Sequence, residues 1–258
     1  MMTKNKSLIT SLLIVLSSLI LFLPFLGNVH LFDWDEINFA ESAREMIITG
    51  DYLNVRINYE LFWEKPPLFI WMQVLSMKLF GINEFAARFP NVIAGITTLL
   101  FLFFIGKKHF NYKTGIIWVI VYAGSILPHF YFKTGIIDPW FNFFIFAGIY
   151  FFIRYLIEEK GQTKFILLSA FFIGLGTLTK GPVALLIFLL AGFIYLLLKR
   201  FRMRISFMDI VLYILVFAFT GGFWFILQIL NGNYDIIYDF VIYQIELFNS
   251  DVAGHKGF

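Results

Sequence analysis

Charged side chains that could carry out group transfer occur at five separate places in this sequence. These places are residues 33–44, the pair Glu64 and Lys65, Asp138, Lys180, and a final segment that contains Asp251, His255 and Lys256. A carboxylate can take the proton from an acceptor hydroxyl as a general base. A lysine or arginine can stabilise the negative charge of a leaving phosphate. These residue types therefore suit the transfer of a group from a phosphate-bearing donor to a hydroxyl.

Each of these charged residues also has a purely structural explanation. Asp35 could be a first-turn acid that the helix dipole favours, and Asp138 could be the N-cap of a helix. Lys180 could extend to water from a tight turn. Glu64 and Lys65 could form a solvated ion pair that contributes little to stability. Residue type alone leaves both explanations open.

The elements that must position these residues are membrane helices. The chain has 258 residues, of which 60% are hydrophobic and 14% charged, whereas soluble domains have about 45–50% apolar and about 25% charged residues. Phenylalanine alone accounts for 35 residues, and a water-soluble fold of this size could not hide so much apolar surface. The net charge of +3 gives no sign of nucleic acid, and the absence of cysteine excludes a disulfide scaffold.

Seven apolar runs are long enough to cross a bilayer, which needs about 20 residues. They are residues 8–26, 85–106, 114–132, 139–157, 164–180, 182–198 and 208–229. The first run follows Lys4 and Lys6 and resembles a signal peptide, but it is longer than the usual signal core and no small-residue cleavage site follows it. We therefore expect an all-α, polytopic membrane protein with about seven spans in one domain, residues 1–258.

The distribution of basic residues predicts how the chain crosses the membrane. With the N-terminus in the cytoplasm, the inner segments contain 12 of the 20 Lys and Arg residues, and the short outer turns contain only Lys133 and Lys180. Those 12 are Lys4, Lys6, Lys107, Lys108, Lys113, Arg154, Lys160, Lys164, Lys199, Arg200, Arg202 and Arg204. The outer loops are then 28–84 and 230–258. All five groups of charged residues face the outer side, which suggests a site there because polar groups at membrane depth are costly.

Two short amphipathic helices are expected within the first outer loop. Residues 36–49 begin after a plausible N-cap at Asp33 and end before Gly50. Residues 67–80 begin at a pair of prolines and end at Gly81. Both helices suit the membrane interface.

Several short motifs in this order resemble a known family of membrane enzymes. They include Asp35-Glu36 with Arg44-Glu45-Met46, Trp63-Glu64-Lys65-Pro66-Pro67, Asp138-Pro139, Lys180-Gly181-Pro182 and Gly254-His255-Lys256. Over essentially the whole chain the sequence resembles the aminoarabinose (ArnT-like) branch of the protein O-mannosyltransferase superfamily, the GT-C glycosyltransferases of families 39 and 83. The resemblance implies a glycosyltransferase of the bacterial inner membrane that acts on the periplasmic side. It would move a sugar from an undecaprenyl-phosphate donor to lipid A or another lipid or protein acceptor.

The resemblance also implies a role for each matching residue. Asp35 would be the catalytic base, and Lys65 would contact the donor phosphate. Arg44, Asp138, Lys180 and Glu36 would line the substrate site. Glu64 and His255 would bind a divalent metal ion, either zinc or magnesium or manganese.

Two alternatives belong to other classes of protein. A transporter or flippase for lipid-linked sugars would place ionisable groups near the centres of its spans, and the predicted spans have none there. An inactive, truncated homologue would not need the paired acids and lysines. Because such proteins usually continue beyond this point, we expect the chain to be part of a longer protein.

Overall fold

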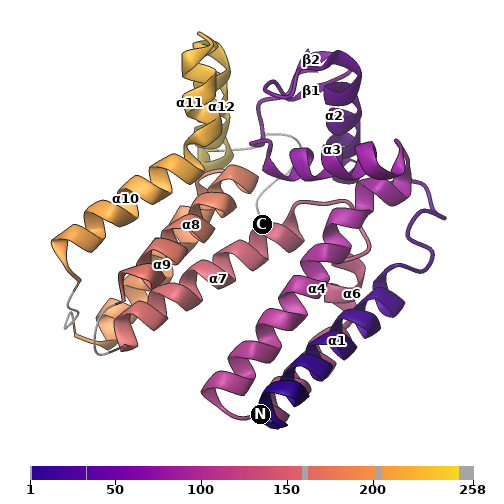
Figure 1. Ribbon diagram of the computed structural model, residues 1–258. Helices are drawn as coiled ribbons and strands as arrows, with labels where there is room; N and C mark the ends of the chain where they lie inside the picture. Colours follow the sequence, from indigo (N-terminus) through magenta and orange to yellow (C-terminus); the bar gives the residue numbers. More distant parts are fainter. Residues whose placement is uncertain (1, 33, 159–161, 201–204, 250–258) are drawn as a thin grey trace. The chain divides into compact units, whose positions relative to one another are not determined.

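The computed structural model describes residues 2–32, 34–158, 162–200 and 205–249, and Figure 1 shows their helices. The described residues form two compact units. Unit 1 comprises residues up to Ile47 together with Ile70–Phe143, and unit 2 comprises Ile48–Phe69 together with residues from Phe144 onward. The expectation of a single domain stays a prediction.

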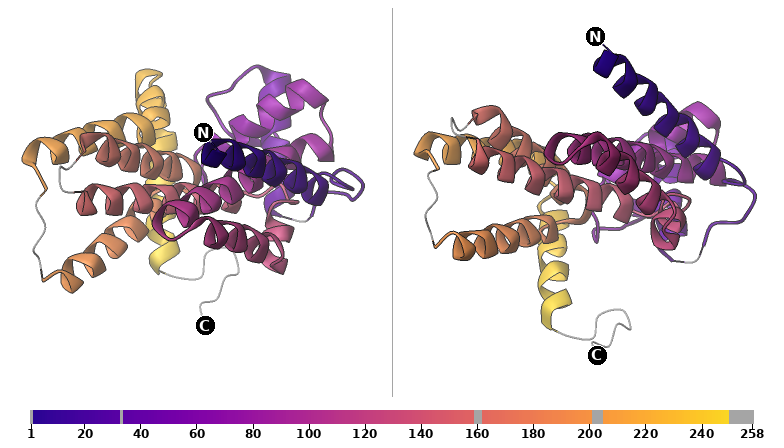
Figure 2. Two further views of the ribbon diagram at one scale, coloured as in Figure 1. Left: turned by 60° about the horizontal axis from the view of Figure 1, so that its bottom comes forward. Right: turned by 90° about the horizontal axis from the view of Figure 1, so that it is seen from below.

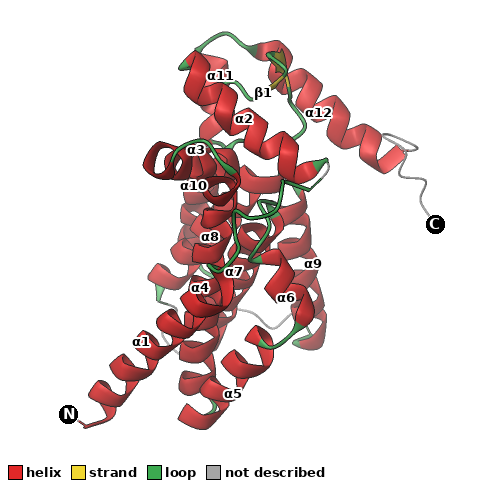
Figure 3. Cartoon of the chain, turned by 90° about the vertical axis from the view of Figure 1, so that its right-hand side faces the viewer, coloured by secondary structure: helices red, strands yellow, loops and turns green. Residues whose placement is uncertain are grey.

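Unit 1 is built around one long helix. Its elements are α1 (Met2–Phe22), most of α2 (Asp35–Thr49) and α3 (Leu68–Phe80), α4 (Glu84–His109), α5 (Tyr112–Ala123) and α6 (Ile126–Tyr131). The 26-residue α4 packs against both α1 and α5 (Figure 3). At about 1.5 Å per residue it is about 39 Å long, enough to cross the hydrocarbon core. Phe22, Leu99 and Phe103 are fully buried in this core.

Close helix contacts in unit 1 depend on small residues. A Cβ on Gly106 of α4 would come within 2.7 Å of the Cα of Gly115 of α5. Small residues at such crossings let membrane helices approach closely enough for dispersion contacts. Asparagine side chains cap both helices, Asn83 by accepting from the amide of Ala86 and Asn111 by accepting from the amide of Thr114.

Unit 2 contains a second group of helices and a short hairpin. Its elements are most of α7 (Asp138–Ile157), α8 (Thr163–Lys180), α9 (Val183–Leu198), α10 (Phe207–Gly221), α11 (Phe223–Leu230), α12 (Tyr234–Asn249), β1 (Arg56–Ile57) and β2 (Glu60–Leu61). Helix α8 packs against α9 and α10, and α12 projects away from these helices (Figure 2). A Cβ on Gly174 of α8 would lie 3.0 Å from the amide nitrogen of Gly221, so the two backbones nearly touch.

The helical, membrane-type architecture is confirmed, whereas the count of seven spans is not. Four described helices are long and apolar enough to cross a membrane: α1, α4, α7 and α8. They match the predicted spans 8–26, 85–106, 139–157 and 164–180. A fifth candidate is the pair α10 and α11, which is bent by 63°.

Proline, glycine and length explain the other differences. The predicted span 114–132 divides into α5 and α6 because the ring of Pro128 would clash with the carbonyl of Gly124 in a continuous helix. The span 208–229 bends at Gly222, where a Cβ would come within 2.3 Å of the carbonyl oxygen of Ala218. The span 182–198 forms α9, which has only 16 residues.

Both predicted amphipathic helices are present within one residue of the expected bounds. Gly50 and Gly81 end α2 and α3 with φ of 72° and 82°, the left-handed conformation that glycine adopts without strain. The proposed N-cap, Asp33, lies outside the described residues. The β-hairpin was not predicted; it turns at Asn58 and Tyr59, whose φ values of 55° and 65° match a type I′ turn.

Candidate functional site

Two of the predicted site residues begin helices in unit 1. Asp35 is the first residue of α2 and is exposed, and Asp138 is the first residue of α7 and is half-buried. A carboxylate in a first helical turn is stabilised by the backbone amides there. A single buried ion pair holds both of the segments that lead into these two helices.

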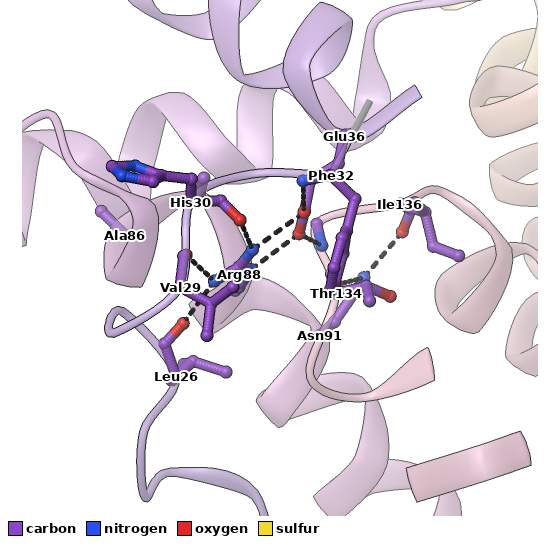
Figure 4. Close-up of polar contacts among 12 residues, drawn as sticks. Leu26, Val29, His30, Phe32, Glu36, Ala86, Arg88, Asn91, Thr134 and Ile136 are labelled. Carbon is purple, nitrogen blue, oxygen red and sulfur yellow. Dashed lines mark hydrogen bonds and ion pairs between the residues drawn. The ribbon is translucent and has the colours of Figure 1, made fainter. Parts of the chain in front are cut away.

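That ion pair joins Arg88 of α4 to Glu36 of α2 (Figure 4). Nε and Nη2 of Arg88 donate to the two carboxylate oxygens of Glu36, at 2.8 and 2.9 Å. The remaining donors of Arg88 reach the carbonyl oxygens of Leu26, Val29 and His30 at 2.7–2.9 Å. All five guanidinium N–H groups therefore have an acceptor. Both side chains are at most 3% exposed.

Glu36 also accepts two backbone amides. The amide of Phe32 donates to Oε2 at 2.6 Å, and the amide of Gly135 donates to Oε1 at 2.5 Å. The first bond fixes the turn that enters α2, in which Trp34 has a φ of 64°, an unusual value for a bulky residue. The second fixes the segment three residues before Asp138. Glu36 was predicted to line the substrate site, and that role stays a prediction. In the structure it is buried and holds the segments that lead to Asp35 and Asp138.

Two amides extend this polar network over the segment before α7. The side-chain nitrogen of Asn91 donates to the carbonyl oxygens of Thr134 and Ile136, at 2.6 and 2.7 Å. The side-chain nitrogen of Gln73 donates to the carbonyl oxygen of Ala87 in α4 at 2.9 Å and to that of Gly135 at 3.5 Å. Asn91 and Gln73 are fully buried, so these bonds to the backbone before Asp138 are shielded from water.

Arg44, another predicted site residue, forms an ion pair within α2. Its Nε and Nη2 donate to both carboxylate oxygens of Glu41, at 2.8 and 2.5 Å. The hydrogen bond from Arg44 lowers the pKa of Glu41 below its usual value of 4.5, and burial opposes this effect. The Arg44 side chain is 33% exposed.

In unit 2 the pair Glu64 and Lys65 contacts a tyrosine of α12. The hydroxyl of Tyr243 donates to Oε2 of Glu64 at 2.9 Å. The Nζ of Lys65 lies 5.3 Å from the centre of the Tyr243 ring and 4.0 Å from Oε2 of Glu64. The Lys65 side chain is only 19% exposed. A cation is therefore held in a partly buried place, where it would interact strongly with an anion.

The segment before this pair is fixed to α11. The indole nitrogen of Trp224 donates to the carbonyl oxygen of Leu53 at 2.8 Å. The side-chain nitrogen of Gln228 donates to the side-chain oxygen of Asn54 at 3.1 Å. Both Trp224 and Gln228 are buried, so these bonds hold residues 53–54 against α11.

An apolar groove of about 530 Å³ lies in unit 2 between the end of α8 and helices α9 to α12. Its lining residues are Thr177, Gly181, Pro182, Leu185, Leu186, Phe217, Phe225, Ile237, Phe240, Val241, Gln244 and Ile245. Lys180 immediately precedes Gly181, and Tyr243 immediately precedes Gln244. Gly181 has a φ of 81°, and a Cβ there would lie 3.2 Å from the ring of Phe240, so glycine allows the turn and the contact with α12.

The predicted site residues are divided between the two units. Asp35, Glu36, Arg44 and Asp138 belong to unit 1, and Glu64, Lys65 and Lys180 belong to unit 2. Their convergence on one substrate stays a prediction.

The predicted metal site is only half described. His255 lies outside the described residues, which contain no group of three His, Cys, Asp or Glu side chains suited to a metal ion. Glu64 alone would supply one ligand, and Lys65 beside it would repel a cation. The described residues therefore do not make a metal site by themselves.

The sequence alone predicts no role for Arg88, Trp224, Gln228 or Tyr243. Arg88 is an ionisable residue four positions into the predicted span 85–106, which is a signal for a buried polar contact. Gln228 is likewise a polar residue in an apolar run. Nothing local to Tyr243 indicates that its partner lies 179 residues away.

Comparisons with known proteins identify similar chains in bacteria. Residues 64–224 match the family described as dolichyl-phosphate-mannose-protein mannosyltransferase. A protein of Aquifex aeolicus is 29% identical over 236 residues, which cover 89% of this chain and 52% of that relative. The undecaprenyl phosphate-alpha-4-amino-4-deoxy-L-arabinose arabinosyl transferase of Edwardsiella ictaluri is 28% identical over 250 residues, which cover 95% of this chain and 44% of that enzyme.

Solved structures with the same fold are also known. ArnT from Cupriavidus metallidurans superimposes with a TM-score of 0.71 in its complex with undecaprenyl phosphate and 0.76 in the apo state. Both matches are 21% identical in sequence and cover 86% of this chain and 42% of that protein. The chain spans about half the length of the curated relatives it matches.

Proposed function

Since the chain belongs to the dolichyl-phosphate-mannose-protein mannosyltransferase family, we propose that it is the part of a membrane glycosyltransferase that binds a polyprenyl-phosphate-linked sugar. One observation carries this proposal. In unit 2 the lining of an apolar groove includes Gly181, which follows Lys180 in sequence, and Gln244, which follows Tyr243. The Tyr243 ring centre lies 5.3 Å from Nζ of Lys65. A prenyl chain needs an apolar groove, and its phosphate needs a cation beside that groove.

The proposed reaction assigns one chemical role to each group. The carboxylate of Asp35 takes the proton from the acceptor hydroxyl, and the acceptor oxygen forms a bond to the anomeric carbon of the sugar. The bond between that carbon and the phosphate oxygen breaks, and its electron pair stays on the departing polyprenyl phosphate. Lys65, assisted by Arg44 and Lys180, stabilises this charge. Asp138 contacts the sugar, and Glu36 acts by positioning Asp35.

We propose the membrane topology that the distribution of basic residues predicts. Seven crossings would require α5 with α6 to form one broken span, α10 with α11 to form another, and the 16-residue α9 to cross a locally thin region. The N-terminus would lie in the cytoplasm, and Asp35 and Lys65 on the periplasmic side. The proposed acceptor is lipid A or another extracytoplasmic lipid or protein, as the sequence resemblance implies.

A transporter for lipid-linked sugars is the rival with some structural basis, because α10 and α11 form a broken helix. Transporters use such breaks to expose backbone groups to a substrate or ion. Here the amide of Gly222 at the break donates to Ala218 at 2.9 Å, and Trp224 beyond it binds Leu53. The break is thus used for internal packing, which favours the enzyme.

Transfer of radiolabelled sugar from undecaprenyl phosphate to lipid A, in proteoliposomes, tests the proposal. Asp35→Asn keeps the shape of the side chain but removes the base, and we expect a loss of at least about 100-fold. Asp235→Asn is the matched control, because Asp235 is also a first-turn acid, in α12. Equal activity of Asp35→Asn and the wild type would refute the assignment of the base. Movement of the donor across the bilayer without transfer would favour the transporter.

A further inference from the structure

One tyrosine of α12 contacts both members of the Glu64–Lys65 pair. The hydroxyl of Tyr243 donates to Glu64 at 2.9 Å, and its ring lies 5.3 Å from the ammonium of Lys65. The pair itself is separated by 4.0 Å, longer than the 2.7–2.9 Å typical of a charge-assisted hydrogen bond. Tyr243 is therefore closer to Glu64 than Lys65 is, and its ring also makes a cation–π contact with Lys65.

The contact with the ring restricts where the ammonium can be. A lysine side chain has many rotamers, and it loses this freedom when it binds an anion. A cation over an aromatic face is held electrostatically without a hydrogen bond. The ring of Tyr243 thus restricts the rotamers of Lys65 before a ligand binds, so that binding itself costs less side-chain entropy.

The hydroxyl acts on the neighbouring carboxylate. A charge-assisted hydrogen bond from Tyr243 orients Oε2 of Glu64, which is the oxygen closest to Lys65. Without it, the carboxylate could rotate toward the ammonium and form a direct ion pair. A phosphate would then have to compete with Glu64 for the same cation.

Helix α12, which carries Tyr243, is joined to α11 and through it to the segment before Glu64. Helices α11 and α12 are joined by a short turn in which the amide of Asn233 donates to the carbonyl oxygen of Gln228 at 3.0 Å. Gln228 in turn binds Asn54, ten residues before Glu64. Tyr243 and the segment that leads to Glu64 are thereby tied to the same pair of helices.

From these contacts we propose that Tyr243 is a positioning residue, which aligns Lys65 for the phosphate of a polyprenyl-phosphate lipid. The inference rests on the proposed function and deepens it, because it names Tyr243 as the residue that lets Lys65 prefer the phosphate group. It predicts that Tyr243 matters for the phosphate group of the lipid and not for its prenyl chain.

The test compares two lipids that differ only in the phosphate. The purified chain, in nanodiscs, is titrated with undecaprenyl phosphate and with undecaprenol, and the ratio of the two Kd values is the phosphate preference. We expect a preference of about tenfold or more for the wild type. Tyr243→Leu, which removes both contacts, should lower it about fivefold, and Tyr243→Phe, which keeps the ring, about twofold.

Two further variants separate positioning from general structure. Tyr238→Phe removes a hydroxyl from a 67% exposed tyrosine of the same helix and should leave the preference unchanged. In a Lys65→Met background, Tyr243→Leu should cause no further loss, because its effect passes through Lys65.

The outcomes distinguish the inference from the proposed function. If the wild type shows no phosphate preference, the proposed donor is wrong. If Lys65→Met has a lower phosphate preference than the wild type, but Tyr243→Phe and Tyr243→Leu have the same preference as the wild type, the role of Tyr243 is refuted. A loss that persists in the Lys65→Met background also refutes it. Should Tyr243→Leu fail to fold, an unchanged preference in Tyr243→Phe decides against the inference, and a twofold loss supports it.

Discussion

Arg88 of α4 donates hydrogen bonds to both carboxylate oxygens of Glu36 in α2, at 2.8 and 2.9 Å, across 52 residues of sequence. Every N–H group of the guanidinium has an acceptor, and each oxygen of Glu36 also accepts one backbone amide. A buried ion pair is stable only when its remaining donors and acceptors are satisfied in this way. The pair therefore fixes two segments at once, the one that precedes Asp35 and the one that precedes Asp138.

Loss of one partner of this pair should destabilise the protein strongly. Arg88→Met leaves the carboxylate of Glu36 buried without its cation, and we expect a loss of about 3–5 kcal/mol in the free energy of unfolding. Thermal unfolding in detergent, followed by circular dichroism, measures the effect. Arg56→Met is the control, because Arg56 pairs with Asp51 at 3.4 Å with both side chains about one-third exposed. That change should cost at most about 1 kcal/mol. Similar unfolding temperatures for the two variants would contradict our account.

The helices could be predicted from sequence much better than the contacts that hold the site. Apolar runs bounded by charge, Gly or Pro located α4, α7 and α8 because the membrane imposes a minimum length on each. The breaks at Pro128 and Gly222 also follow from residue type, although length alone had suggested continuous spans.

Pairings over long sequence separations leave no local pattern. Arg88 and Tyr243 each bind an acid of the motifs that could be identified, but their partners lie 52 and 179 residues away. Glu36 shows the consequence: its place in an acidic pair of the sequence does not indicate that it is buried and paired with Arg88.

Packing between α8 and α10 should not tolerate even one methyl group at Gly174. A Cβ there would come within 2.8 Å of the Cβ of Thr220 and 3.0 Å of the amide nitrogen of Gly221. We expect Gly174→Ala to destabilise the protein by about 1–3 kcal/mol, although alanine favours a helix by about 1 kcal/mol over glycine. Gly192→Ala is the matched control, since the nearest atom to its Cβ would be 4.0 Å away. The unfolding temperature of Gly192→Ala should therefore equal or exceed that of the wild type, and that of Gly174→Ala should be lower.

The ion pair within α2 should make stability depend on acid pH. Arg44 lowers the pKa of Glu41 in the folded protein below its usual 4.5. A lowered pKa contributes stability that is fully present above the unfolded pKa and is lost as the pH falls through the folded pKa. We therefore expect Glu41→Gln to cost up to about 1 kcal/mol at pH 6 and progressively less below pH of about 4. Arg44→Gln should show the same convergence with the wild type at low pH. A difference that does not change with pH would show that packing, and not charge, causes the effect.

The two ends of α4 should lie on opposite sides of the membrane, with the end near Lys107 and Lys108 in the cytoplasm. The chain has no native cysteine, so a single introduced cysteine reports its own position. Ile82 and Phe110 flank α4 and are 49% and 64% exposed, which makes both suitable for labelling. In intact cells we expect a membrane-impermeant maleimide to label Ile82→Cys, and to label Phe110→Cys only after permeabilisation, because basic residues are retained inside. Labelling of Phe110→Cys in intact cells would reverse the orientation and place Asp35 and Lys65 in the cytoplasm, where a periplasmic donor could not reach them.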